Sequence, residues 1–131
     1  MFIDASAFVA ILASEEGADS LVAKLQQTTT RRTSSMAIWE TSLTLGRQRQ
    51  IAPTDALTLV TGFIRLLSVS VEPIGQEIGE LAVIAYQRFG KGRHPAGLNF
   101  GDCFAYACAR HLDMPLLYKG DDFSKTDIHA A

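Results

Sequence analysis

Hydrophobic and polar residues follow two different spacings along the chain. Short apolar or alternating runs, bounded by polar, glycine or proline residues, predict four strands: residues 2–3, 31–34, 68–72 and 115–118. Segments with apolar residues three or four positions apart predict six helices: about 5–13, around 21–25, 36–49, 53–66, around 78–85 and 101–112. Because strands and helices alternate, we expect an α/β fold in which helices flank a short central parallel sheet.

Some element ends are marked by individual residues. Thr54 or Asp55 is expected to cap the helix that opens at Pro53. Residues 90–97 contain too much glycine and too few apolar residues to continue a helix, and they predict a loop. The polar tail is expected to add a last short strand around residues 127–128.

Length and composition are those of one compact unit. The chain has 131 residues, 47% of them hydrophobic, which predicts a single domain over residues 1–131. No apolar run approaches the roughly 20 residues of a membrane span, and the first residues lack the features of a secretory signal. A soluble, cytoplasmic protein with no membrane attachment is therefore expected. Cys103 and Cys108 are predicted to be small core residues rather than a disulfide.

The formal charge of −2 argues against binding of nucleic acid through bulk positive charge. It does not exclude an enzyme that acts on nucleic acid. Such an enzyme can hold acids around a metal and basic residues beside them, and the net charge averages the two regions.

Several acids lie where an α/β fold brings distant segments together. Asp4 directly follows the first predicted strand, and the pair Asp121-Asp122 follows the last one after Gly120. In parallel sheets, ligands bind beyond the carboxyl ends of the strands, so these acids are expected at the same edge. Asp4 is equally suited to cap the first helix, and the pair is equally suited to a turn.

Two further acids lie on predicted helices. Asp102 is near the start of a helix, where the helix dipole alone favours an acid. Glu40 follows Trp39 and lies on roughly the same side as the apolar Leu43, although glutamate is also common on helix surfaces. No single acid establishes a site, but several carboxylates held together repel one another and favour a hard divalent cation.

The chain resembles the PIN-domain family of VapC-like toxins over nearly its whole length. The matching pieces are residues 1–7 (MFIDASA), Glu40 in the third predicted helix, residues 90–103 (GKGRHPAGLNFGDC) and residues 116–128 (LLYKGDDFSKTDI). The first piece is weak alone. The two later stretches are specific, and their order and spacing agree with the first.

This resemblance implies a PIN-like fold and a magnesium-dependent endoribonuclease, with manganese as an alternative metal. It also implies homodimers and neutralisation by a cognate antitoxin protein. The catalytic acids carry over as Asp4, Glu40 and Asp102, with Asp4 and Asp102 as direct metal ligands. For the fourth acid we favour Asp121, and we expect Asp122 to organise the turn.

Polar and basic neighbours of these acids are candidates for supporting roles. Ser6 is placed to donate a hydrogen bond to a carboxylate or phosphate, and capping of the first helix is the alternative. Lys91, Arg93 and His94 precede Asp102 on the glycine-containing loop, where they are candidates for contact with RNA phosphates or for a solvated loop.

Two other functions fit an acidic pocket. One is a metal-dependent phosphatase acting on small phosphomonoesters, although a phosphoaspartate phosphatase usually has Asp-x-Asp after its first strand and this chain has Asp4-Ala5-Ser6. The other is a non-catalytic module that holds a structural cation and acts through a partner. Metal-dependent activity on RNA and on a small phosphate ester separates the three functions.

Overall fold

Four short strands form the parallel sheet that the sequence predicts. In a computed structural model that describes residues 1–131, they are β1 (Phe2–Ile3), β2 (Arg32–Ser34), β3 (Ser70–Glu72) and β4 (Leu116–Leu117). Their order in the sheet is β3-β2-β1-β4, and all neighbours are parallel. The central strand β1 therefore pairs with β2 on one side and β4 on the other.

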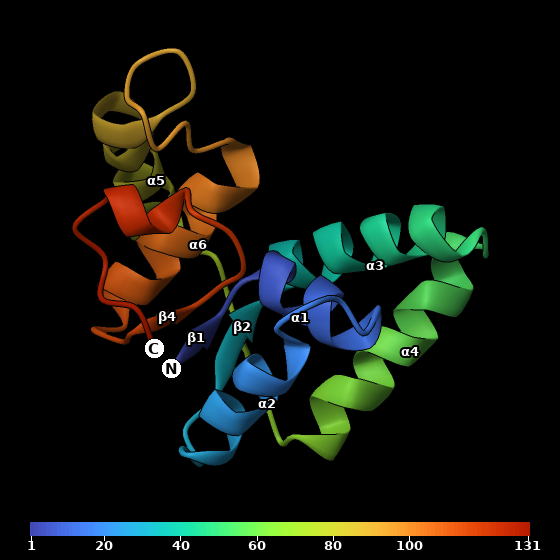
Figure 1. Cartoon of the computed structure of the whole chain (residues 1–131). Coiled ribbons are helices and arrows are strands. Elements are labelled where there is room, and N and C mark those ends of the chain that lie inside the picture. The colour runs from blue at the N-terminus through green and yellow to red at the C-terminus, as the bar shows by residue number, and fades with distance from the viewer.

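Helices cover both faces of the sheet (Figure 1). The helices α5 (Gln76–Phe89) and α6 (Phe100–His111) pack together on one side. On the other side lie four helices: α1 (Ala5–Leu12), α2 (Ala18–Gln26), α3 (Ser35–Arg49) and α4 (Pro53–Leu66). None of them combines the length and the apolar character that a membrane span requires.

Two apolar cores lie on the two faces of the sheet because successive strand side chains point in opposite directions. Phe2 is fully buried among residues of α5 and α6, and its neighbour Ile3 is fully buried among residues of α1, α2 and α4. Cys103 and Cys108 are buried free thiols of the α5–α6 core, as predicted. Burial of both faces explains why the two strands β1 and β4 are short apolar runs.

The connection order creates a crevice at the carboxyl ends of β1 and β4. The chain proceeds from β1 to β2 and β3 on one side and then returns to place β4 on the other side of β1. Ligands of open α/β sheets bind where the strand order reverses in this way. A direct hydrogen bond from the Asp4 amide to the Leu117 carbonyl, 2.9 Å long, joins the two strand ends at this point.

The expectation of a strand around residues 127–128 is wrong. The segment after β4 forms a short 3₁₀ helix, η1 (Phe123–Lys125), and returns to β4 only through an isolated bridge between Leu116 and Ala130. The Ile128 amide donates to Thr126 Oγ1, at 3.2 Å, instead of to a neighbouring strand. Local side-chain bonds of this kind compete with a sheet ladder.

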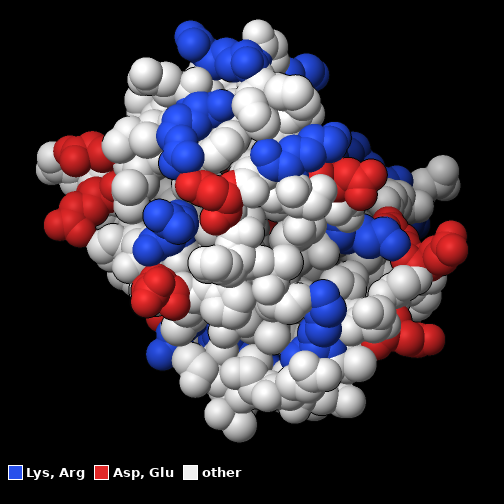
Figure 2. Space-filling view, turned by 60° about the vertical axis from the view of Figure 1, so that its left-hand side comes forward, with Lys and Arg blue, Asp and Glu red and all other residues white.

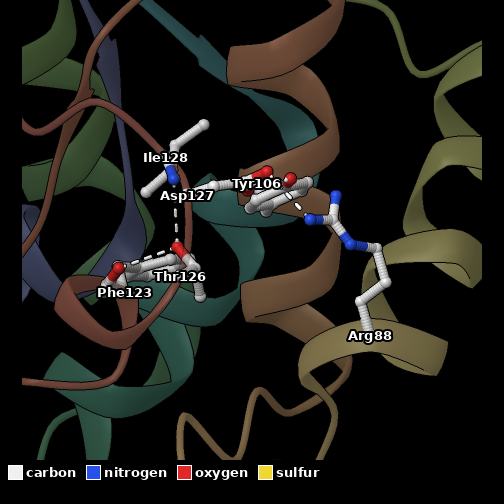
Figure 3. Close-up of polar contacts among 6 residues, drawn as sticks. All are labelled: Arg88, Tyr106, Phe123, Thr126, Asp127 and Ile128. Carbon is white, nitrogen blue, oxygen red and sulfur yellow. Dashed lines mark hydrogen bonds and ion pairs between the residues drawn. The ribbon is translucent and has the colours of Figure 1, made fainter.

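The same segment is attached through Asp127 (Figure 3). Its carboxylate accepts a 2.6 Å hydrogen bond from the Tyr106 hydroxyl of α6 and a 2.9 Å ion-paired bond from Arg88 of α5. The segment that carries the Asp121-Asp122 turn is therefore fixed to both helices of that face.

The predicted cap of α4 is also wrong. Ala52 is the N-cap residue and Pro53 takes the first helical position, so Thr54 and Asp55 lie inside the first turn. Proline fixes this start because its ring has a helical φ angle and it has no amide hydrogen to satisfy.

Candidate active site

Five carboxylates line one pocket at the crevice between β1 and β4, and one of them, Glu15, lies outside the predicted set. The pocket has a volume of about 280 Å³. Its acids from the predicted set are Asp4, Glu40, Asp102 and Asp122. Ser6, Asn99 and Lys119 also line it. The structure thus brings together residues that are up to 118 positions apart.

Asp4 occupies the deepest position of the four. Its side chain is almost completely buried, and its Oδ2 accepts bonds from the Ser6 amide at 2.9 Å and the Ser6 hydroxyl at 2.5 Å. Burial raises the pKa of Asp4, and the bonds from Ser6 oppose that rise. Asp4 is therefore both the N-cap of α1 and an acid of the pocket.

Ser6 connects the two strand ends. While its hydroxyl donates to Asp4, its oxygen accepts a 3.0 Å bond from the Lys119 amide that follows β4. The expected donation from Ser6 to a carboxylate is therefore present.

Asp102 lies in the first turn of α6 and forms a capping box with Asn99. Its Oδ2 accepts from the Asn99 amide at 2.8 Å, and Asn99 Oδ1 accepts from the Asp102 amide at 2.9 Å. Burial raises the pKa of Asp102 to about 6; the bond from Asn99 opposes this rise, and the carboxylates of Asp4 and Asp122 contribute to it. This bond fixes the carboxylate in the pocket and occupies only one of its two oxygens.

Glu40 enters the pocket from α3. The helix begins at Ser34, whose hydroxyl accepts from the Ala37 amide at 3.2 Å. The half-buried Glu40 carboxylate lies against the first turn of α6. Burial, together with the nearby carboxylates of Asp4 and Asp102, raises its pKa to about 7.

Asp121 was expected in the pocket, but the acid that the turn after Gly120 contributes to it is Asp122. Asp122 lines the pocket and raises the pKa of Asp102, while Asp121 does not line it. Gly120 has a φ of +102°, a left-handed conformation that glycine adopts freely, and the turn directs the second aspartate inward. Nor does Asp122 organise the turn through its side chain, which makes no capping bond at η1.

Charges outside the pocket are mixed. Figure 2 shows basic and acidic side chains interspersed over the face in view, with uncharged surface between them. The mixture on this face agrees with the formal net charge of −2.

Comparison with known proteins identifies the family to which this chain belongs. Residues 1–129 match the PIN domain family. The chain belongs to the PIN-domain family. Its relatives include a ribonuclease VapC of Mycolicibacterium smegmatis, 38% identical over 99% of this chain and 98% of the relative, and ribonuclease VapC28 of Mycobacterium tuberculosis, 39% identical over 100% of this chain and 97% of the relative. These relatives place the chain among the VapC ribonucleases of that family.

A solved structure supports the fold of this PIN-domain protein. VapC20 of Mycobacterium tuberculosis, a sarcin–ricin loop cleaving toxin, superposes with a TM-score of 0.76 over 99% of this chain and 97% of VapC20, at 18% identity. The parallel sheet flanked by helices is therefore the PIN-like α/β fold that the sequence predicts.

The acidic pocket of this PIN-domain protein fits a hard divalent cation. All of its anionic groups are carboxylates, and burial and the neighbouring carboxylates raise the pKa values of Glu40 and Asp102. No three of its acids are close enough to hold an ion together by direct contact. Magnesium usually retains several waters and needs only one or two direct carboxylates, so this spacing is compatible with it.

The predicted basic loop lies outside the pocket. None of Lys91, Arg93 and His94 lines it. His94 has structural contacts, because its Nδ1 accepts from the Ala96 amide at 3.1 Å and its ring packs on Phe89. The exposed Arg93 guanidinium lies over the ring of Tyr86, 5.5 Å from its centre, and Lys91 is exposed.

Four polar residues of the pocket were not among the predicted site residues: Glu15, Thr44, Asn99 and Lys119. Lys119 lies on its wall and donates through Nζ to the Glu16 carbonyl. Its position directly before the Gly120-Asp121-Asp122 turn is the sequence feature that could have predicted its place in the pocket. Asn99 forms the capping box with Asp102. The sequence feature that could have predicted this is an asparagine three positions before an aspartate, which is the spacing of a capping box.

Proposed function

We propose that this chain is the toxin of a toxin–antitoxin pair, a metal-dependent endoribonuclease that cleaves RNA phosphodiester bonds in the acidic pocket. The observation that carries the proposal is the convergence of Asp4, Glu40, Asp102 and Asp122 on one crevice at the carboxyl ends of β1 and β4. The relatives named ribonuclease VapC support the same activity.

Asp4 and Asp102 are the proposed metal ligands. Asp4 is deeply placed and rigidly oriented by Ser6, and Asp102 is oriented by Asn99. Magnesium is the proposed ion, with manganese as the alternative. When bound, it would neutralise the carboxylates and polarise the scissile phosphate.

Glu40 is the proposed base. Its pKa of about 7 leaves it divided between its two protonation states near neutral pH, which suits a group that accepts a proton from an attacking water. Asp122 contributes a further carboxylate to the pocket.

Cations beside the pocket are the proposed contacts of the RNA backbone. Lys119 is the nearest, on the pocket wall itself. Lys91, Arg93 and His94 would bind phosphates further along the chain, on the loop between α5 and α6. RNA is held through phosphates by such basic side chains whatever the net charge of the protein.

The proposed partners are an RNA substrate, a cognate antitoxin protein that blocks the pocket, and a second copy of this chain. The proposed location is the cytoplasm, and residues 1–131 are proposed to act as one domain.

RNA cleavage by the purified protein tests this function. We expect cleavage with magnesium or manganese, none with chelator, and at least about a hundredfold loss in Asp4→Asn and Asp102→Asn. Asp55→Asn, an exposed acid in the first turn of α4, is the control and should keep wild-type activity. Hydrolysis of a small phosphate ester without RNA cleavage would show a phosphatase, and metal binding without either activity would show a binding module.

A further inference from the structure

Gly101 lies in the first turn of α6, between Phe100 and Asp102. A Cβ atom at this position would overlap Glu40 Oε2, and would lie 3.0 Å from Glu40 Cδ and 3.2 Å from Oε1. The three nearest atoms all belong to the Glu40 carboxylate. The bare backbone of residue 101 is therefore the surface against which this carboxylate rests.

The backbone itself does not require glycine here. Gly101 is absent from the residues with positive φ, and it lies in a regular helix. Glycine is less favourable in helices than any residue except proline. The nearest atoms that a side chain at residue 101 would meet are those of the Glu40 carboxylate.

We propose that Gly101 is a positioning residue, which sets the place of the Glu40 carboxylate in the acidic pocket by leaving room for it on the first turn of α6. The inference rests on the proposed function only in the role given to Glu40; the contact itself is a property of the fold. It explains how an acid from α3 comes into the same pocket as Asp102 of α6.

The contact predicts a selective defect. The group that meets the added methyl is the far end of a flexible side chain, which can rotate away without moving the backbone of either helix. A second hollow, lined by Trp39 and Phe100, borders both Glu40 and Gly101 and offers space for the displaced carboxylate. The fold should therefore survive while Glu40 leaves the pocket.

The test compares Gly101→Ala with two matched controls. Gly62→Ala in α4 and Gly79→Ala in α5 make the same change in a helix where a Cβ meets nothing within 4 Å. We expect all three variants to melt at or above the wild-type temperature, because alanine favours helices. Only Gly101→Ala should lose RNA cleavage, by about a hundredfold, the effect of moving a reacting group by an ångström.

A rescue separates positioning from general damage. Glu40→Asp shortens the side chain by one methylene and should lower the activity of the wild type. In the Gly101→Ala background the shorter side chain clears the new methyl, so adding Glu40→Asp should cause no further loss. A crystal structure of Gly101→Ala should show the Glu40 carboxylate outside the pocket.

Three results would overturn the inference: full cleavage by Gly101→Ala beside an active wild type, fully additive losses in the double variant, or a drop in melting temperature that the two controls do not show. A wild type without ribonuclease activity would instead contradict the proposed function. The position of Glu40 in the variant crystal would then still decide the inference.

Discussion

At the scale of single residues, the pocket holds several carboxylates close together, and without a metal their repulsion lowers the stability of the fold. Glu40 and Asp102 are removed from water and lie close to other carboxylates, and both effects favour the protonated form. A group with a raised carboxyl pKa holds its proton in the folded state at a pH where the unfolded chain has lost it. Folding stability must therefore depend on pH through these groups.

The first prediction follows from the sign of that dependence. The pKa of Glu40 is raised from 4.5 to about 7, so between these values the folded state binds more protons than the unfolded chain. In the presence of chelator, the free energy of unfolding should fall as pH rises through this window and level off above it. Urea titrations from pH 4.5 to 8 measure the effect.

Glu40→Gln should flatten part of this decline, because glutamine carries no proton to lose. Glu80→Gln, on the exposed surface of α5, is the control and should keep the wild-type slope. Added magnesium should reverse the decline by neutralising the carboxylates. A stability that rises with pH over the window would contradict the assignment of raised pKa values.

The second prediction concerns the two aspartates after Gly120. Asp122 lines the pocket and Asp121 does not, so Asp122→Asn should lower cleavage and manganese affinity by about tenfold to a hundredfold, the usual range for groups around a metal. Asp121→Asn should remain active. Both variants should melt as the wild type does, because neither side chain makes a hydrogen bond that orders η1. An inactive Asp121→Asn beside an active Asp122→Asn would reverse the assignment.

At the scale of elements, hydrophobic spacing predicted the sheet and all six helices, because each apolar stripe is buried in one of the two cores. The tail was mispredicted because its conformation depends on Asp127 meeting Arg88 and Tyr106, which are 39 and 21 residues away. Which of Asp121 and Asp122 lies in the pocket likewise depends on the direction of the turn at Gly120. The spacing of apolar residues and the composition report neither contacts between distant residues nor the direction of a turn.

The third prediction tests how the tail is held. Asp127→Asn removes the charge that accepts from both Tyr106 and Arg88, and an amide cannot accept on both of its atoms (Figure 3). We expect a loss of about 1 kcal/mol in the free energy of unfolding from the hydrogen bond of Tyr106. The ion pair with Arg88 should contribute little, because it is exposed and screened by solvent. Tyr106→Phe and the double variant complete a double-mutant cycle. Strictly additive losses would show that the Asp127 and Tyr106 side chains do not interact.

At the scale of the whole molecule, an apolar surface on α3, α5 and α6 lies beside the pocket. It includes Trp39, Val83 and Phe100, whose side chains are 64%, 67% and 69% exposed. Two hollows of about 780 and 340 Å³ share Phe100 and Phe104, and the smaller one is lined without any charged residue. Depletion of charge at an exposed apolar patch is typical of an interface between copies of one chain.

The last prediction is that this surface joins two copies of the chain. Val83→Asp places a charge at the uncharged hollow, and a symmetric pair would have to bury that charge twice, so the variant should be monomeric. Leu66→Asp is the matched control, since Leu66 is 78% exposed on α4 and lines neither hollow. Light scattering after size exclusion should give a dimer mass for the wild type and Leu66→Asp and a monomer mass for Val83→Asp. A monomeric wild type would refute the pairing, and a dimeric Val83→Asp would place the interface on another face. Because Glu40 borders the larger hollow, pairing through this surface would bring the second copy to the edge of the acidic pocket.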